Sequence, residues 1–177
     1  MLRHAGQLLL CQGREQLLRN DENAPAFSDG RQSERALMVQ RGVCRLFAAH
    51  GFAAVAEVTL ASGRRADLVG LGAKGEIWIV EIKTGVEDYR ADRKWPDYLA
   101  FCDSFFFATH AETPAAIFPE ETGLIIADPY GGEIVRARPH APLAAARRKA
   151  MMLRLAQTAA QRLHGLMDPS FDGGVRF

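Results

Sequence analysis

Three acidic side chains and one lysine fall in a part of the sequence that otherwise has the pattern of buried β-sheet. The segment 76–83, Glu-Ile-Trp-Ile-Val-Glu-Ile-Lys, is apolar on both faces of a strand, yet it ends with Glu81 and Lys83. Glu and Lys are rarely buried unless their charges are compensated. Asp67 lies one predicted hairpin earlier, and Glu57 one hairpin before that. Carboxylates beside a lysine could bind a divalent cation and activate water for hydrolysis.

The predicted turns decide whether these side chains can meet. If residues 73–75 form a three-residue loop with its glycine left-handed, Asp67 lies directly opposite Glu81. A similar loop at 61–63 places Glu57 opposite Asp67. A four-residue loop in the second hairpin would instead put Asp67 and Glu81 on opposite faces of the sheet. The shorter loops predict a row of three carboxylates across three strands.

Such a row requires compensation, because like charges opposed across strands destabilise a sheet. Oxygen ligands alone favour Mg²⁺, with Mn²⁺ as an alternative, over zinc. The next row on the same face would hold Thr59, Arg65 and Lys83. Lys83 could orient a water or stabilise charge that develops on a phosphate, and Arg65 could contact nucleic acid.

Hydrophobic periodicity and turn residues predict the elements that position this site. A helix is expected over 33–50, followed by a meander of three strands. A polar helical segment, one more strand, a hairpin and a final helix follow. Their expected ranges are strands 54–60, 65–71 and 76–83, helical segment 87–102 with an interruption or restart at Pro96, strand 104–110, hairpin strands 123–127 and 133–137, and helix 142–164.

This order predicts an α/β fold of three layers, α/β/α, around a central mixed sheet. A strand, a helical crossover and a second strand in one sheet normally make the two strands parallel. Residues 1–32 are polar and rich in turn formers, so they are expected to be a flexible lead-in. Residues 33–165 would form the folded domain and 166–177 a tail.

Composition excludes several classes of protein. The chain has 177 residues, 48% of them hydrophobic, and a formal charge of +1, so no overall field indicates an acidic partner. Three scattered cysteines form neither a disulfide framework nor a zinc motif. No apolar run is long enough for a membrane span or a secretory signal, so we expect a cytoplasmic protein without a membrane partner.

The spacing Asp-x13-Glu-x-Lys, formed by Asp67, Glu81 and Lys83 after a helix, resembles the PD-(D/E)XK nuclease superfamily. The resemblance covers about residues 33–137 and implies a restriction-endonuclease-like fold. It implies that Asp67 and Glu81 bind Mg²⁺ and that Lys83 is the catalytic lysine. Glu34, on the first helix, is the candidate for a further ligand, with Glu57 as an alternative or an addition. The proline that usually precedes the aspartate is replaced by Ala66.

The stretches "GRRADLVGL", "IVEIKTG" and "DYRADRKWPDYLAFCDSFFFA" more narrowly resemble the MmcB-like family of bacterial DNA repair proteins. This resemblance implies a role in the DNA damage response, with DNA as a partner and other repair proteins as further partners. The leading hypothesis is therefore a Mg²⁺-dependent deoxyribonuclease. The alternatives are a DNA-binding or repair-recruitment module that keeps the fold without cutting, and a nuclease that acts on RNA.

Other residues have both a functional and a structural interpretation. Lys94 could lie beside the metal, with Arg90 or Arg93 on phosphates. The structural alternative is an amphipathic helix whose apolar residues, Trp95, Leu99 and Phe101, lie partly in the core. Glu34 could simply complement the dipole of the first helix. Glu57 could instead be a solvated residue of an edge strand that pairs with Arg64 or Arg65.

Overall fold

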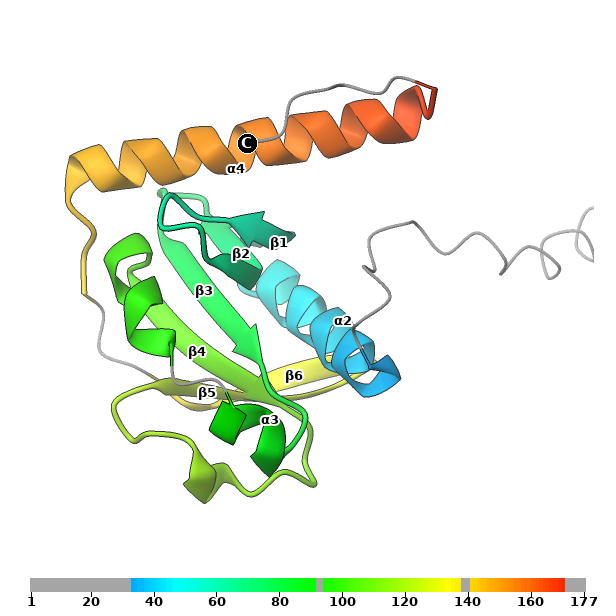
Figure 1. Ribbon diagram of the computed structural model, residues 1–177, viewed down its shortest axis with the longest axis vertical. Coiled ribbons are helices and arrows are strands. Elements are labelled where there is room, and N and C mark those ends of the chain that lie inside the picture. The colour runs from blue at the N-terminus through cyan, green and yellow to red at the C-terminus, as the bar shows by residue number, and fades with distance from the viewer. Residues whose placement is uncertain (1–32, 92–93, 138–140, 171–177) are drawn as a thin grey trace, which may run out of the picture. The chain divides into compact units, whose positions relative to one another are not determined.

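The computed structural model describes residues 33–91, 94–137 and 141–170, and its fold is α/β (Figure 1). The expected lead-in, residues 1–32, lies outside the described residues. One mixed sheet contains six strands, arranged in the order of the chain. These strands are β1 (Phe52–Thr59), β2 (Arg65–Gly72), β3 (Ile77–Ile82), β4 (Ser104–Thr109), β5 (Gly123–Asp128) and β6 (Gly131–Arg136).

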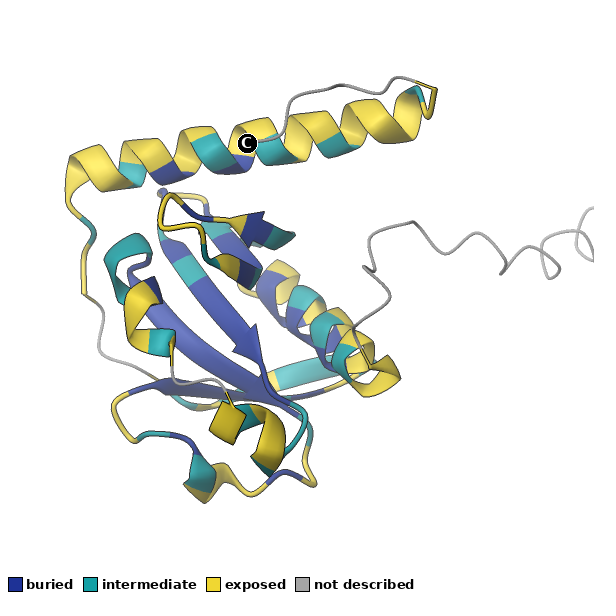
Figure 2. Ribbon diagram, viewed as in Figure 1, coloured by how far each residue is buried: buried dark blue, intermediate teal, exposed yellow. Residues whose placement is uncertain are grey.

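Helices cover both faces of this sheet, as the order of elements predicts. α2 (Glu34–Ala49) packs on one face. The opposite face is covered by α3 (Val86–Ala91), the 3₁₀ helix η2 (Trp95–Phe101) and α4 (Ala145–Met167). The middle strands are consequently buried on both sides, as the dark blue ribbons of β3 and β4 show in Figure 2.

α2 forms where the sequence predicts a helix. Ser33 caps its N-terminus by accepting a hydrogen bond from the backbone N–H of Ala36, 3.2 Å away. Val39, Val43 and Phe47 repeat at helical spacing and are buried against the sheet. The helix therefore fixes one face of the sheet and leaves the opposite face for α3, η2 and α4.

Both predicted hairpin registers are confirmed. The backbone N–H of Gly72 bonds to Glu76 O at 2.8 Å, and Gly75 is left-handed, with φ of 84°. Across the first hairpin, Leu60 N–H bonds to Arg64 O at 2.7 Å, and Gly63 has φ of 81°. Each turn thus has the short loop on which alignment of the carboxylates depends.

The parallel strands bring the predicted site residues to one edge of the sheet, the edge that is formed by strand ends rather than by an outer strand. β3 pairs with β4 in parallel, and β4 pairs with β5 in parallel, so their carboxyl ends meet at the same edge. β2 runs antiparallel to β3, so its first residues lie at this edge too. Ligand sites of open α/β sheets commonly lie at such an edge.

The segment 87–102 is divided into α3 and η2, and Pro96 lies in the first turn of η2, so the predicted restart at Pro96 is confirmed. Other predicted boundaries were wrong: β6 begins at Gly131 rather than at 133. α4 begins at Ala145 rather than at 142, because Asp103 accepts the backbone N–H of Leu143 at 2.8 Å and holds this stretch in a non-helical conformation. α4 continues through Gly165 to Met167 rather than ending at 164. Residues 171–177 of the expected tail lie outside the described residues.

Candidate metal centre

Asp67 and Glu81 meet where β2 and β3 stop pairing through their backbones. The last backbone pair towards this edge is Leu68 with Val80. Beyond it, Asp67 Oδ2 accepts the N–H of Ile82 at 2.7 Å, and Glu81 Oε1 accepts the N–H of Asp67 at 3.3 Å. The two carboxylates thus replace ladder hydrogen bonds, which holds them side by side on one face, as the predicted register requires.

Burial perturbs both carboxyl groups strongly. Glu81 is 4% exposed, and this desolvation, together with the charge of Asp67, raises its pKa to about 8. Desolvation also raises the pKa of Asp67 to about 6, and the nearby charges of Glu57 and Asp88 add to the effect. Two adjacent carboxyl groups with raised pKa values lose their protons reluctantly, and a bound cation would stabilise their charged forms.

Lys83 immediately follows β3 and is buried, with 7% of its surface exposed. Its backbone N–H bonds to Ala108 O at 2.9 Å, which continues the pairing of β3 with β4. Its positive charge lowers the pKa of both Asp67 and Glu81, although burial outweighs this effect. The structure therefore brings Asp67, Glu81 and Lys83 together.

Glu57 lies at the predicted position, but its carboxylate is engaged elsewhere. The pairs Ala56 with Leu68 and Val58 with Ala66 flank it, which places Glu57 opposite Asp67. Glu57 Oε2 forms an ion pair with Arg65 Nε at 2.6 Å. In the described part of the chain, no three His, Cys, Asp or Glu side chains are grouped closely enough to hold a metal ion.

The backbone of Glu57 is strained, and α4 contacts it. Among the described residues other than glycine, Glu57 alone has a positive φ, 49°. Arg162 of α4 donates to the carbonyl of Glu57 at 2.7 Å and to that of Ala56. Arg154 donates to the carbonyl of Thr59 at 2.8 Å. These arginines satisfy acceptors of β1, the edge strand, and link α4 to the site.

Two further residues belong to this site, although the sequence did not indicate them. Tyr98 of η2 is buried; its hydroxyl donates to Arg65 O at 3.1 Å, and its hydrogen bond with Glu81 lowers the pKa of that carboxyl. Asp88 of α3 accepts the N–H of Thr84 at 2.9 Å and raises the pKa of Asp67. A tyrosine in an amphipathic segment is usually a packing residue, so no signal in the sequence separated Tyr98 from its aromatic neighbours.

The other predicted residues are exposed or paired elsewhere, and one lies outside the described residues. Glu34 is exposed in the first turn of α2, and it is not among the charges that shift the pKa of Asp67 or Glu81. Arg90 is exposed and pairs with Glu87 at 3.2 Å. Lys94 is exposed immediately before η2, Arg65 is held by Glu57, and Arg93 lies outside the described residues.

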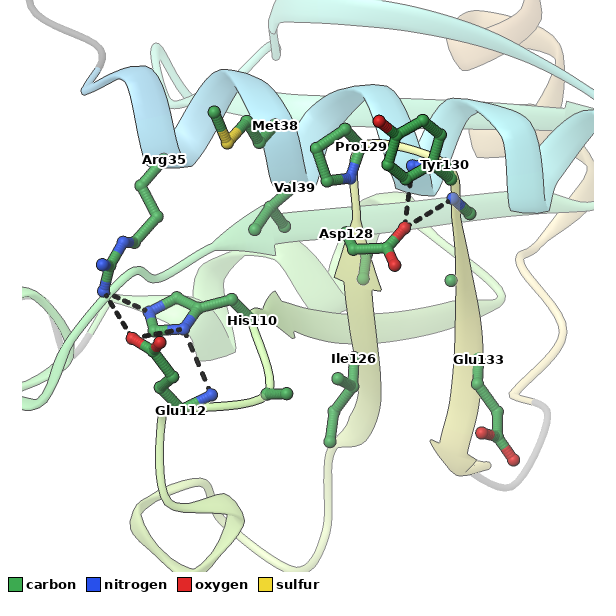
Figure 3. Close-up of a pocket in the computed structure, with 14 residues that line it drawn as sticks. Arg35, Met38, Val39, His110, Glu112, Ile126, Asp128, Pro129, Tyr130 and Glu133 are labelled. Atoms are coloured by element: carbon green, nitrogen blue, oxygen red, sulfur yellow. Dashed lines mark hydrogen bonds and ion pairs between the residues drawn. The ribbon is translucent and has the colours of Figure 1, made fainter.

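A separate hollow of about 590 Å³ opens between α2 and the β5–β6 hairpin (Figure 3). At one end, Arg35 forms an ion pair with Glu112 at 3.2 Å and contacts His110. Asp128 and Glu133 also line the hollow, so its acidic groups outnumber its arginine. This charge balance does not suit a phosphate, and the candidate metal centre does not include the hollow.

The described helices include none that is long and apolar enough to cross a membrane. The family described as "DNA repair protein MmcB-like" matches residues 23–170. A solved structure, the SPO1766 protein of unknown function from Silicibacter pomeroyi, is 46% identical, with a TM-score of 0.77. That match covers 82% of this chain and 99% of the other. No curated protein matches. The match over most of the chain shows that it belongs to the MmcB-like family of DNA repair proteins.

Proposed function

We propose that this DNA repair protein is a Mg²⁺-dependent deoxyribonuclease that hydrolyses phosphodiester bonds at the centre formed by Asp67, Glu81 and Lys83. The observation that carries the proposal is the pair of buried carboxylates beside a buried lysine, at the edge of the sheet where parallel strands end. The family supplies the repair context, and the chemistry of the three side chains supplies the reaction type.

The donor set fits Mg²⁺. This ion is usually bound in proteins through one or two carboxylates, and it keeps several waters that substrate phosphates can replace. Asp67 and Glu81 supply two carboxylates, and the raised pKa of each shows that the pair lacks sufficient compensation for two negative charges. Glu57 is the candidate for an additional ligand if its ion pair with Arg65 is exchanged.

The side chains at the centre would have distinct roles in hydrolysis. Bound Mg²⁺ would supply Lewis-acid stabilisation of a phosphoryl oxygen and a water of lowered pKa. Asp67 and Glu81 would hold it, and Tyr98 would fix the Glu81 carboxylate through its hydroxyl. The Lys83 ammonium would orient the attacking water or stabilise the charge that develops on the phosphate.

The test is cleavage of duplex, nicked, branched and single-stranded DNA with and without Mg²⁺ or Mn²⁺. We expect Lys83→Ala and Asp67→Asn to reduce metal-dependent cleavage by ~100-fold or more. Lys74→Ala is the matched control, because Lys74 lies exposed in the β2–β3 turn. Cleavage that survives Asp67→Asn or Lys83→Ala undiminished would refute the assignment.

The same panel separates the alternatives. Binding of DNA without turnover in either metal, unaffected by Lys83→Ala, would indicate a non-catalytic DNA-binding module. Faster cleavage of RNA than of DNA of matched sequence would indicate a ribonuclease, because a site that reads the 2′-OH prefers RNA. We expect cleavage of DNA over RNA.

A further inference from the structure

One long face of α4 is apolar and exposed. Only Met151 and Leu155 of this 23-residue helix are buried, whereas Leu153 is 55% exposed and Leu163 is 58% exposed. In Figure 2, yellow segments of exposed residues recur along the α4 ribbon from one end to the other. A hollow of about 540 Å³ beside Leu143 opens onto the first half of this face. Exposed apolar patches of this extent commonly mark interaction sites.

The exposed face has the spacing of a helix–helix seam. Leu153, Ala156, Ala160, Leu163 and Met167 follow one another at intervals of three and four residues. This is the heptad pattern that lets one helix pack along another, and the alanines in the middle allow close approach of the helix axes. The face that docks α4 on its own sheet, centred on Met151 and Leu155, is a different one.

The charges of α4 indicate what could cover the seam. The helix contains no Asp or Glu, and Arg147, Arg148 and Lys149 lie in its first turns, where the helix dipole disfavours positive charge. Arg148 is compensated within the chain by Asp103 at 2.7 Å. The C-terminal end of an antiparallel helix would place negative dipole charge beside Lys149, which lies on the same face as the seam.

We propose that α4 pairs with α4 of a second copy of this chain in antiparallel orientation. The register that matches side chains in size places Leu153 of one copy opposite Leu163 of the other. Ala156 then lies opposite Ala160, and Lys149 lies opposite Met167, close to the end of the other helix and Asp168. The arrangement is self-complementary, as a two-fold symmetric dimer requires. It does not depend on the proposed nuclease activity.

Light scattering after size exclusion, over a range of concentrations of the full chain, tests the pairing. We expect the wild type to have the mass of two chains, and Leu153→Glu or Leu163→Glu to have the mass of one. Val135→Glu is the matched control, because Val135 is 44% exposed on β6 and should leave the dimer intact. Thermal unfolding checks that each variant is folded.

A monomeric wild type at every concentration, or a dimer that persists in both glutamate variants, overturns the proposal. Binding of the wild-type face to an acidic amphipathic peptide or to anionic vesicles, without self-association, overturns it in favour of those partners.

Cross-linking tests the register. Two cysteines can be bridged when their Cα atoms lie within about 7 Å. Under mild oxidation, we expect Ala156→Cys/Ala160→Cys to form a covalent dimer more efficiently than either single variant, and the wild type, with its native cysteines, to form none. Efficient bridging by Ala160→Cys alone would indicate a parallel pair and contradict the antiparallel register.

Discussion

At the scale of single residues, the molecule keeps two carboxyl groups where neither is well solvated. Burial raises the pKa of Glu81 to about 8 and that of Asp67 to about 6, so the pair together holds about one proton at neutral pH. The pair then carries about one negative charge rather than two. A divalent cation that binds both carboxylates must displace this proton, so metal affinity should rise with pH.

The raised pKa of Glu81 predicts how stability depends on pH. Because the folded-state pKa lies above the ordinary value of 4.5, the folded protein binds more protons than the unfolded chain between about pH 4.5 and 8. The free energy of unfolding should therefore fall as pH rises through this window. Glu81→Gln should flatten the fall and be more stable than the wild type at pH 8 by ~2 kcal/mol.

Urea denaturation at several pH values measures this difference. Glu133→Gln, an exposed change on β6, is the control and should follow the wild-type curve. A Glu81→Gln variant whose stability falls with pH as steeply as that of the wild type would contradict the raised pKa.

Tyr98 should affect the pKa of the same carboxyl group, that of Glu81. Its hydrogen bond with Glu81 lowers the pKa of that group, so Tyr98→Phe should move the pKa upward from about 8. Titration of the side-chain carboxyl signals by NMR measures the shift. Tyr89→Phe is the control, because Tyr89 packs against the rings of Phe107 and Phe118 and is not among the groups that shift Glu81. A lower pKa in Tyr98→Phe would mean that the hydroxyl does not favour the carboxylate.

The sequence predicted the pairing of Asp67 with Glu81, because glycines at two turn positions fix loop length and loop length fixes register. Of the two interpretations of Glu57, the ion pair with Arg65 is the one that the structure contains. The sequence did not predict the positive φ of Glu57 within β1, where Arg162 of α4, about a hundred residues later in the chain, donates to its carbonyl. Such contacts leave no local pattern in the sequence.

At the scale of elements, α2 lies so close to the β5–β6 turn that one of its residues must be glycine. A Cβ on Gly42 would lie 2.0 Å from Asp128 O and 2.4 Å from Gly131 O, both backbone atoms. Alanine is favoured over glycine in a helix by about 1 kcal/mol, but overpacking of this kind costs about 1–3 kcal/mol.

Gly42→Ala should therefore be destabilised relative to the wild type. Gly165→Ala in α4 is the matched control: nothing lies within 4 Å of its added Cβ, so it should be neutral or stabilised by up to about 1 kcal/mol. Thermal unfolding of both variants gives the comparison. A stabilised Gly42→Ala would show that α2 can move away from the turn.

α4 is anchored to the sheet by one buried ion pair. Arg148 donates two hydrogen bonds of 2.7 Å to Asp103, which is 1% exposed and also accepts the N–H of Ile77. Burial alone would raise the pKa of Asp103, but the hydrogen bonds from Arg148 and from the backbone outweigh it, and the pKa is lowered. The pair therefore stabilises the fold above the ordinary pKa of an aspartate.

Arg148→Ala should lower the free energy of unfolding by ~3 kcal/mol at neutral pH, because it leaves a buried carboxylate without its partner. Arg90→Ala, which breaks an exposed pair within α3, is the control and should change stability by at most about 1 kcal/mol. Urea denaturation compares the two. Equal effects would mean that Asp103 gains solvent when α4 is released.

At the scale of the whole molecule, the three-layer arrangement follows from the apolar residues that lie on both faces of the middle strands. β3 and β4 have apolar residues on both faces, which predicted helices on each side, and the parallel pairing of β3 with β4 follows from the crossover. The docking of α4 did not follow, because arginines on a helix are usually solvated, whereas Arg148, Arg154 and Arg162 each bond into the fold.

The central claim is that Asp67 and Glu81 bind a divalent cation with Lys83 beside it. Crystals grown with Mn²⁺ and a short DNA test this most directly, because manganese is located by its anomalous scattering. We expect a manganese peak within direct coordination distance of carboxylate oxygens of both Asp67 and Glu81, in contact with a DNA phosphate. Manganese bound elsewhere, with these two carboxylates still bonded to the backbone of β2 and β3, would contradict it.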